Sequence, residues 1–221
     1  MAPLSFSRGS TDANQTSTIW VGIGANIGGN WGAPRDTFDR VLAELGLCGF
    51  SMVVRSSLYL TPPFGRTGQP RFLNAVFGMR GSVAPSSLLR LVKRLEVRAG
   101  RRANGRWGPR PLDIDILDFG GRVIGRPAAA RVPGGLVLPH PELAWRGFVL
   151  VPLVEVAPRW RHPRLNVSAE TLLRHRPGLD RGIQQLGPWG GGDRALSALA
   201  PKVQFFDDHV PSGVDLPRHL I

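Results

Sequence analysis

A rigid basic loop turns into a strand at residues 106–116, which read Arg106-Trp107-Gly108-Pro109-Arg110-Pro111-Leu112-Asp113-Ile114-Asp115-Ile116. Side chains of a strand alternate between its two faces, so Leu112, Ile114 and Ile116 are predicted to enter a core. Asp113 and Asp115 then project together from the opposite face. The stretch therefore predicts a core strand that carries two carboxylates side by side.

This carboxylate pair has the chemistry of a metal–polyphosphate site. Two unpaired carboxylates repel each other, and a divalent cation keeps both ionised. Mg²⁺ prefers hard oxygen ligands and usually takes one or two carboxylates together with substrate phosphate oxygens. Arg106 and Arg110 flank the preceding turn, and guanidinium groups bind phosphate through paired hydrogen bonds. An Asp-X-Asp triplet alone is often just a solvated strand face, but the stiff, aromatic, basic loop before it favours function.

The order of predicted elements gives the fold class. Strands are predicted at 20–24, 50–60, 72–79 and 112–119, and helices at 34–47 and 85–99. The first helix is indicated by Pro34 at its start and by apolar residues at spacings of three and four. The proline- and glycine-rich loop 61–71 is a candidate lid. The order strand, helix, strand, strand, helix, strand is the ferredoxin-like pattern, so we predict an α+β fold: an α-β-α sandwich with a mainly antiparallel sheet.

The bulk properties suit one domain. The chain has 221 residues, and we predict a main domain at 18–187 between a disordered N-terminal tail, 1–17, and a loosely ordered C-terminal tail, 188–221. A short helix capped by Ser168 is predicted at 168–174. The sequence shows no membrane-spanning run and no secretory signal, and its single cysteine excludes an intrachain disulfide framework. We therefore expect a cytoplasmic protein without membrane contact, as a monomer, with a dimer left open.

The formal charge of +12 allows nucleic acid as an alternative partner. Only Lys93 and Lys202 are lysines, so part of the arginine content can reflect the composition of the source genome. Local clustering is more informative, and basic residues gather before the two aspartates, at Arg94, Arg98, Arg101, Arg102, Arg106 and Arg110. Nucleic-acid binders often interleave such arginines with stacking aromatics, and this cluster holds Trp107 alone. Nucleic-acid binding is therefore the second hypothesis.

Four segments, in order, resemble the 6-hydroxymethyl-7,8-dihydropterin pyrophosphokinase family of folate biosynthesis. Residues 106–116 match its Arg-Trp-Gly-Pro-Arg-X-Leu-Asp-hydrophobic-Asp signature, and residues 21–28 match its first strand and Gly-Asn turn. Residues 56–65 with 69–75 are similar to its pterin-side loop and the next strand. The last matching blocks are Leu138-Pro139-His140-Pro141 and residues 146–153. The resemblance spans residues 19–158 and implies that the main domain is a catalytic domain of this fold.

The resemblance implies transfer of a pyrophosphoryl group from ATP to the hydroxymethyl oxygen of the dihydropterin, with AMP leaving. Asp113 and Asp115 match metal ligands, implying two Mg²⁺ ions, and Arg110 matches a phosphate-contacting arginine. Arg101 matches a mobile loop that closes over the phosphates, and these four residues are the expected catalytic set. The expected ATP-binding residues are Glu96, Arg101, Arg102, Arg110, Ile116, His140 and Arg146.

On the pterin side, Trp107 and Phe148 match flat surfaces that sandwich the ring, and the Asn74 amide offers a donor and an acceptor for its polar edge. The expected substrate-binding residues are Thr61, Pro62, Phe64, Phe72, Asn74, Trp107 and Phe148. Ordinary core packing is the alternative for Phe72 and Phe148, and an ion pair with an arginine is the alternative for Glu96.

The chain also departs from the family pattern. The segment from Gly100 to Trp107 is shorter, which affects the placement of Arg102. Lys93 stands where glutamine is expected, and Gly135 and Val137 stand where basic and hydroxyl residues are expected. These differences affect nucleotide affinity more than chemistry. A third hypothesis is a catalytically silent relative that serves protein interaction, which the intact Asp113, Asp115, Arg110 and Trp107 disfavour.

Overall fold

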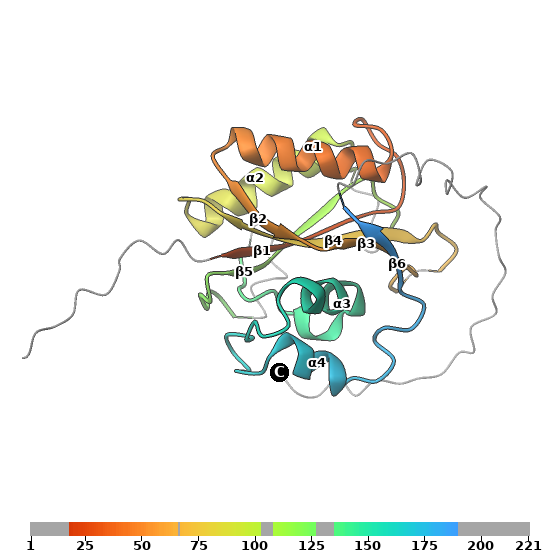
Figure 1. The fold of residues 1–221 in the computed structure, drawn as a ribbon. Coiled ribbons are helices and arrows are strands. Elements are labelled where there is room, and N and C mark those ends of the chain that lie inside the picture. The colour runs from red at the N-terminus through yellow and green to blue at the C-terminus, as the bar shows by residue number, and fades with distance from the viewer. Residues whose placement is uncertain (1–17, 66, 103–107, 127–134, 190–221) are drawn as a thin grey trace, which may run out of the picture. The chain divides into compact units, whose positions relative to one another are not determined.

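The computed structural model describes residues 18–65, 67–102, 108–126 and 135–189. Within them the strands form one antiparallel sheet in the order β5-β1-β4-β3-β6, and β2 also pairs with β4 (Figure 1). The strand bounds are Ile19–Ala25 for β1, Ser51–Arg55 for β2, Ser57–Thr61 for β3, Phe72–Arg80 for β4, Asp113–Phe119 for β5 and Gln184–Pro188 for β6. The central order agrees with the ferredoxin-like pattern.

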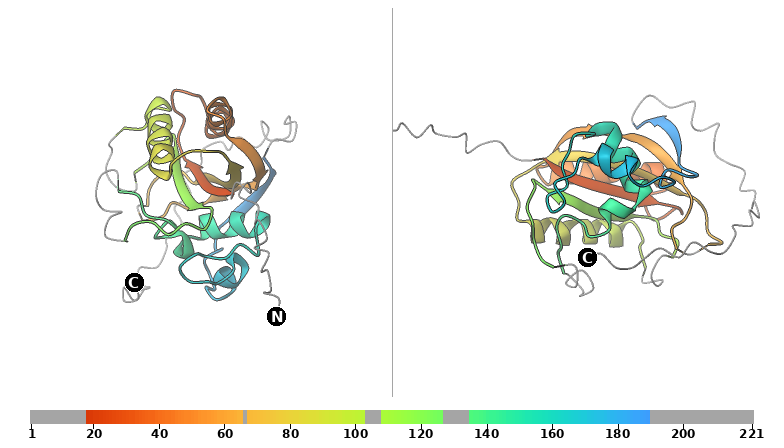
Figure 2. Two further views of the ribbon diagram at one scale, coloured as in Figure 1. Left: turned by 90° about the vertical axis from the view of Figure 1, so that its left-hand side faces the viewer. Right: turned by 90° about the horizontal axis from the view of Figure 1, so that it is seen from below.

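Helices cover both faces of this sheet. Helices α1 (Pro34–Leu47) and α2 (Pro85–Arg98) lie on one face, while α3 (Gly147–Val156) and α4 (Ala169–Arg174) lie on the other (Figures 1 and 2). Two apolar clusters fill the two interfaces. One joins α1 and α2 to the sheet through residues such as Phe38 and Leu95, and the other joins α3 to it through Leu150 and Leu153. The predicted α+β sandwich is confirmed.

Helices α1 and α4 follow the sequence pattern closely. Helix α1 begins at Pro34 and ends at Leu47, and the carboxylate of Asp36 accepts a hydrogen bond from the backbone N–H of Ala33, 3.1 Å away. Proline suits a first turn because its missing N–H would have no helical partner there. Ser168 caps α4 by accepting a hydrogen bond from the N–H of Thr171. The prediction for each of these elements is confirmed.

The predicted single strand at 50–60 is wrong, because the chain forms two strands there, β2 and β3. Ser56 separates them: its N–H donates to the carbonyl of Val76 at 2.8 Å, and its hydroxyl accepts from the N–H of Val76 at 3.0 Å. A buried serine therefore replaces part of the regular ladder with β4. Both strands still pair with β4, so the topology is preserved.

Three elements of the described ranges were not anticipated from the sequence: α3, β6 and the short 3-10 helix Leu143–Trp145. Helix α3 is apolar around most of its circumference and contains Pro152, so it lacks an amphipathic period. Strand β6 adds to the edge of the sheet beside β3, and Trp189, only 3% exposed, follows it. The packed chain thus continues two residues beyond the boundary predicted at 187. None of the helices in the described ranges is long and apolar enough to span a membrane.

Candidate active site

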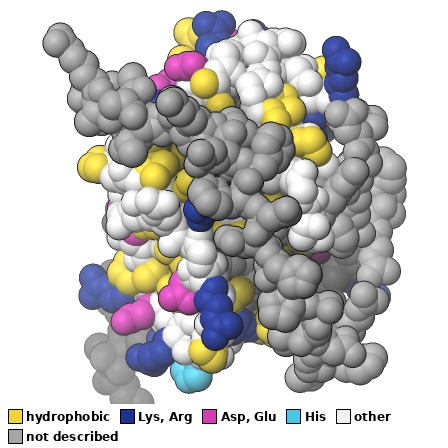
Figure 3. Space-filling view, turned by 90° about the vertical axis from the view of Figure 1, so that its right-hand side faces the viewer, with side chains coloured by type: hydrophobic (Ala, Val, Ile, Leu, Met, Phe, Trp, Pro, Cys, Tyr) yellow, Lys and Arg dark blue, Asp and Glu magenta, His cyan; other side chains and the backbone are white. Residues whose placement is uncertain are grey.

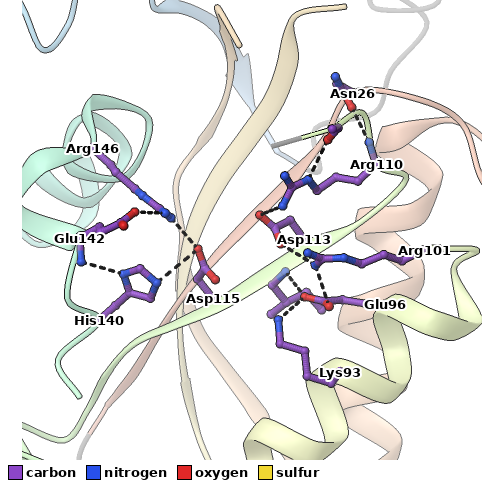
Figure 4. A network of polar contacts seen from close by, with 12 residues as sticks. Asn26, Lys93, Glu96, Arg101, Arg110, Asp113, Asp115, His140, Glu142 and Arg146 are labelled. Atoms are coloured by element: carbon purple, nitrogen blue, oxygen red, sulfur yellow. Dashed lines mark hydrogen bonds and ion pairs between the residues drawn. The ribbon is translucent and has the colours of Figure 1, made fainter. Parts of the chain in front are cut away.

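Asp113 and Asp115 project from β5 to the same side, as the alternation of a strand predicts (Figure 4). In the pairing of β5 with β1, Asp113 lies opposite Gly24 and Asp115 lies opposite Gly22. The carboxylate side chains are 28% and 23% exposed. Since the two glycines carry no side chains, the surface beside the carboxylates is left open.

A hollow, called the first hollow from here on, lies in front of this surface. It has a volume of about 670 Å³, is open to solvent, and is floored by Gly22 and Gly24. Its walls include the sequence-predicted residues Thr61, Pro62, Phe64, Phe72, Asn74, Arg110, Asp113, Asp115, Arg146 and Phe148. The fold therefore gathers the expected substrate-binding residues that lie within the described ranges around both aspartates.

A second hollow, of about 570 Å³, lies on the other side of Asp115. It is lined by Ile116 and His140 from the expected ATP-binding set, and also by Lys93. Gly135 and Val137, which depart from the family pattern, line it too. Asp115 lines both hollows and so marks the point where they meet.

Two arginines hold Asp113 in its ionised form. Arg101 Nη1 lies 2.6 Å from Asp113 Oδ1, and Arg110 Nη1 lies 3.1 Å from Oδ2. Burial alone would raise the pKa of Asp113, but the positive charges of Arg110, Arg101 and Lys93 outweigh it, so the pKa is lowered. A charged carboxylate is the form that a metal ion needs.

Glu96 supports this pair from inside the protein. Its side chain is 3% exposed and forms ion pairs with Lys93 and Arg101, each at 2.7 Å. It also accepts a hydrogen bond from the backbone N–H of Ile114 at 2.9 Å. Burial raises the pKa of Glu96, and the two cations oppose that shift only in part. The geometry favours the alternative reading of Glu96, a partner that orients Arg101. Arg102, by contrast, is exposed.

Asp115 has a different set of neighbours. Arg146 Nη1 lies 3.1 Å from Asp115 Oδ2, while Nη2 of the same guanidinium pairs with Glu142. His140 Nε2 lies 3.8 Å from Asp115 Oδ2, and His140 Nδ1 accepts a hydrogen bond from the N–H of Glu142. Burial lowers the pKa of His140, which favours the neutral ring. Because Nδ1 accepts, Nε2 carries the proton and can donate toward this junction.

The first hollow combines apolar surface with one oriented amide. Phe64 and Phe148 meet edge to face with ring centroids 6.3 Å apart, and the guanidinium of Arg146 lies 5.5 Å from the centre of the Phe148 ring. Asn74 Nδ2 donates to the hydroxyl of Thr61 at 2.8 Å, which fixes the amide. A flat heterocycle with a polar edge fits such a lining.

The residues present fit a divalent cation. Across the described part of the chain, no three His, Cys, Asp or Glu side chains converge as ligands. Magnesium does not need such a cage, because it commonly takes one or two carboxylates and completes its shell with waters and phosphate oxygens. Asp113 and Asp115 supply hard oxygens at the edge of an open hollow and would be the protein ligands.

Two of the residues singled out in the sequence are not described by the structure, and some residues of the site were not predicted. Trp107 and Arg106 lie outside the described residues. Lys93, Glu142 and Asn26 belong to the site network, yet none was among the predicted site residues. The only sequence signals for them were the unexpected lysine at 93 and the position of Asn26 in the first turn. The partners of Asn26 are distant in the sequence, whereas Lys93 pairs with Glu96 three residues on and Glu142 with Arg146 four residues on.

The chain is similar to known proteins over most of its described length. Residues 20–158 match the family model for 7,8-dihydro-6-hydroxymethylpterin-pyrophosphokinase (HPPK). The 2-amino-4-hydroxy-6-hydroxymethyldihydropteridine pyrophosphokinase of Synechocystis is 38% identical over 69% of this chain and 73% of its own length. The protein of the same name from Methylorubrum extorquens is 37% identical over 76% and 97%, respectively. Wild-type HPPK-DHPS of Plasmodium falciparum, crystallised with SDX-DHP, shares the fold with a TM-score of 0.53 at 14% identity, over 77% of this chain and 47% of that longer one. The chain belongs to the HPPK family.

Proposed function

We propose that this protein transfers the pyrophosphoryl group of ATP to 6-hydroxymethyl-7,8-dihydropterin, giving AMP and the pterin diphosphate. The observation that carries the proposal is the meeting of two hollows at Asp115, with Asp113 beside it on the same strand. One hollow suits a flat acceptor and the other a nucleotide. A reaction between two bound substrates needs this kind of junction.

ATP is assigned to the second hollow, with its phosphates reaching the arginines that pair with the two aspartates; two of these, Arg110 and Arg146, line the first hollow. Arg101 and Arg110 lie beside Asp113, and Arg146 lies beside Asp115, so three cations surround the junction. Guanidinium groups bind phosphate oxygens in pairs and stabilise charge that develops during transfer. His140 Nε2–H supplies a neutral donor there. Two Mg²⁺ ions held by Asp113 and Asp115 would neutralise the polyphosphate and lower the pKa of the attacking hydroxyl.

The dihydropterin is assigned to the first hollow. Phe148 offers a ring face, and the Asn74 amide, oriented by Thr61, faces the polar edge of the heterocycle. Trp107 remains the proposed second face of the sandwich. This orientation brings the hydroxymethyl group of the substrate toward Asp113 and Asp115.

The chemistry is an in-line displacement at the β-phosphorus of ATP. The hydroxymethyl oxygen forms a bond to the β-phosphorus and loses its proton, while the bond from the β-phosphorus to the α,β-bridging oxygen breaks and AMP leaves with that oxygen. Phosphoryl transfer of this kind depends mainly on positioning and charge stabilisation. The described site offers carboxylates, arginines and one neutral histidine for these tasks, and no further group stands out as a general base.

The cellular setting is part of the same proposal. We expect the reaction to take place in the cytoplasm, where ATP is abundant, with the monomer as the functional unit. We also propose that catalysis belongs to the main domain predicted at 18–187, together with β6 and the buried Trp189 that complete its packing.

Nucleic-acid binding is the weaker alternative. On the visible part of the face in Figure 3, Lys and Arg side chains are scattered among other side chains and do not form one continuous patch. Nucleic-acid binding would show affinity that falls steeply with salt for any oligonucleotide. A silent relative would have no need for ionised carboxylates facing two open hollows.

Product analysis tests the proposal directly. The purified protein is incubated with ATP and Mg²⁺, with and without 6-hydroxymethyl-7,8-dihydropterin, and the phosphorus products are separated. AMP that forms only with the pterin supports pyrophosphoryl transfer. ADP would indicate transfer of one phosphoryl group, free pyrophosphate would indicate adenylyl transfer, and the absence of turnover would favour a silent relative.

A further inference from the structure

Asn26 joins two chain segments that border the first hollow, and Figure 4 shows its contact with the segment that carries Arg110. It lies just after β1 and is only 7% exposed. Its side-chain nitrogen donates to Gln69 Oε1 at 3.1 Å and to the carbonyl of Pro70 at 3.0 Å. Its side-chain oxygen accepts from the N–H of Arg110 at 2.8 Å, and its own N–H donates to the Arg110 carbonyl at 3.1 Å.

These contacts require a side-chain amide. One end of the group must donate twice toward the 61–71 loop, and the other must accept from the arginine segment. An aspartate has nearly the same shape and can still accept from Arg110. It has no N–H for the Pro70 carbonyl, which its negative oxygen would face instead, and Gln69 could keep a contact only by turning its own amide to donate. Asparagine is therefore the residue type that satisfies both segments at once.

Both joined segments carry groups of the reaction site. The loop that Asn26 holds through Gln69 and Pro70 runs from Thr61 at one end to Phe72 just beyond the other, and both of these residues line the first hollow. Arg110 also lines it and pairs with Asp113. Because one buried amide is bonded to both segments, a movement of one segment displaces the amide and with it a bonding partner of the other segment. The link spans 43 and 44 residues on one side and 84 on the other.

We propose that Asn26 is a positioning residue that couples the acceptor-side loop to the arginine segment, so that a ligand in one hollow raises the affinity for a ligand in the other. This inference rests on the proposed function, because it assumes that the hollows take two different substrates. Coupling between sites is reciprocal and commonly amounts to about 5- to 150-fold in affinity.

Calorimetry on the full chain tests the coupling. The affinity for 6-hydroxymethylpterin is measured with and without Mg²⁺ and an ATP analogue whose α,β-bridging oxygen is a methylene group. In the wild type the analogue is expected to tighten pterin binding by about fivefold or more. Asn26→Asp is expected to reduce that factor to about one, since it keeps the Arg110 contact but places a negative oxygen against the Pro70 carbonyl, so that this bond to the loop is lost.

Asn30→Asp is the matched control. Asn30 lies in the same turn, and its exposed side chain donates to the carbonyl of Arg98 at 3.1 Å, away from the 61–71 loop. This variant should keep the wild-type coupling factor. The proposal is overturned if wild type binds both ligands independently, or if Asn26→Asp retains the wild-type factor.

Hydrogen exchange without ligands tests whether Asn26 holds the 61–71 loop in place. Backbone amides at 67–71 should exchange faster in Asn26→Asp than in wild type or Asn30→Asp, because the bond that holds the loop at the Pro70 carbonyl is lost. Unchanged exchange there would overturn the inference, whether or not the ligands bind. If wild type binds neither ligand, the proposed function fails, and the exchange result still decides whether Asn26 holds the loop.

Discussion

Gly24 of β1 lies directly opposite Asn74 of β4, and a Cβ atom on Gly24 would come within 2.6 Å of Asn74 Oδ1. The absence of a side chain at residue 24 therefore creates the space in which the amide of Asn74 sits. The amide in turn is fixed by Thr61. The lack of a side chain at Gly24 thus allows the orientation of Asn74, the residue assigned to the polar edge of the pterin.

Gly24→Ala should displace the Asn74 amide and weaken pterin binding by about tenfold or more, the effect of losing one well-placed hydrogen-bonding group. Affinity for ATP should change little. Calorimetric titration with 6-hydroxymethylpterin measures the effect. Gly46→Ala in α1 is the control, because nothing lies within 4 Å of a Cβ there. Equal pterin affinity in wild type and Gly24→Ala would show that Asn74 does not recognise the ring.

Glu142→Gln should increase the Mg²⁺ concentration needed for half-maximal activity severalfold. Arg146 shares its guanidinium between Glu142 and Asp115, so removing the charge of Glu142 leaves Arg146 to compete with the metal for Asp115. Turnover at saturating Mg²⁺ should remain close to wild type. Mn²⁺ binding in the presence of the ATP analogue, followed by electron paramagnetic resonance, gives a readout independent of activity. An unchanged metal requirement would mean that Arg146 does not compete.

Stability should depend on pH through His162. This ring is 6% exposed, its Nδ1 accepts from the N–H groups of Arg164 and Leu165, and burial lowers its pKa. As the pH falls below the ordinary pKa of histidine, about 6.5, the unfolded chain takes up a proton before the folded chain does, so the folded state loses stability.

His162→Asn removes that titration while keeping an acceptor. Between pH 7.5 and 5.5, its melting temperature should fall by a few °C less than that of wild type. Exposed His175→Asn should behave like wild type. Thermal unfolding at several pH values makes the comparison, and parallel curves for wild type and His162→Asn would rule out the assignment.

Trp189 should be a major contributor to stability. It is 3% exposed, contacts the rings of Phe38 and Phe77, and donates from its indole N–H to Asp39 at 2.9 Å. Trp189→Ala should cost about 3–5 kcal/mol in the free energy of unfolding. Trp145→Ala, at a side chain that is 56% exposed, should cost less than about 1 kcal/mol. Urea denaturation compares them, and similar losses would contradict the packing of Trp189.

The sequence predicted those parts of the fold that have a clear period. The three-and-four spacing gave α1 its bounds, and the alternation in β5 placed both carboxylates on one side. Helix α3 escaped prediction because a helix buried between the sheet and α4 is apolar on nearly every side and loses its period. Strand β6 escaped because it contains glycine and proline, and it is stabilised by β3, a distant segment.

The site was predictable where chemistry lies within one short motif. Asp113, Asp115 and Arg110 are neighbours in the sequence, and the contact between Arg110 and Asp113 follows from that proximity. The role of Asn26 depends on partners brought close only by folding, such as Arg110. That of Glu142 depends on the fold placing its sequence neighbour Arg146 beside Asp115. Single-sequence patterns contain no signal for such contacts, so these residues had to be found in the structure.

The most direct test of the carboxylate junction compares turnover of wild type, Asp115→Asn and Asp118→Asn across a range of Mg²⁺ concentrations, with folding checked by circular dichroism. Asp118 lies on the same strand but is 2% exposed and bonded to the indole of Trp160, outside both hollows. Asp115→Asn is expected to lower pterin-dependent AMP formation by at least about a hundredfold while folding normally. Asp118→Asn should stay within about threefold of wild type, since it removes no charge from the junction. A folded Asp115→Asn protein with near wild-type turnover would show that the Asp115 carboxylate is not needed for pyrophosphoryl transfer.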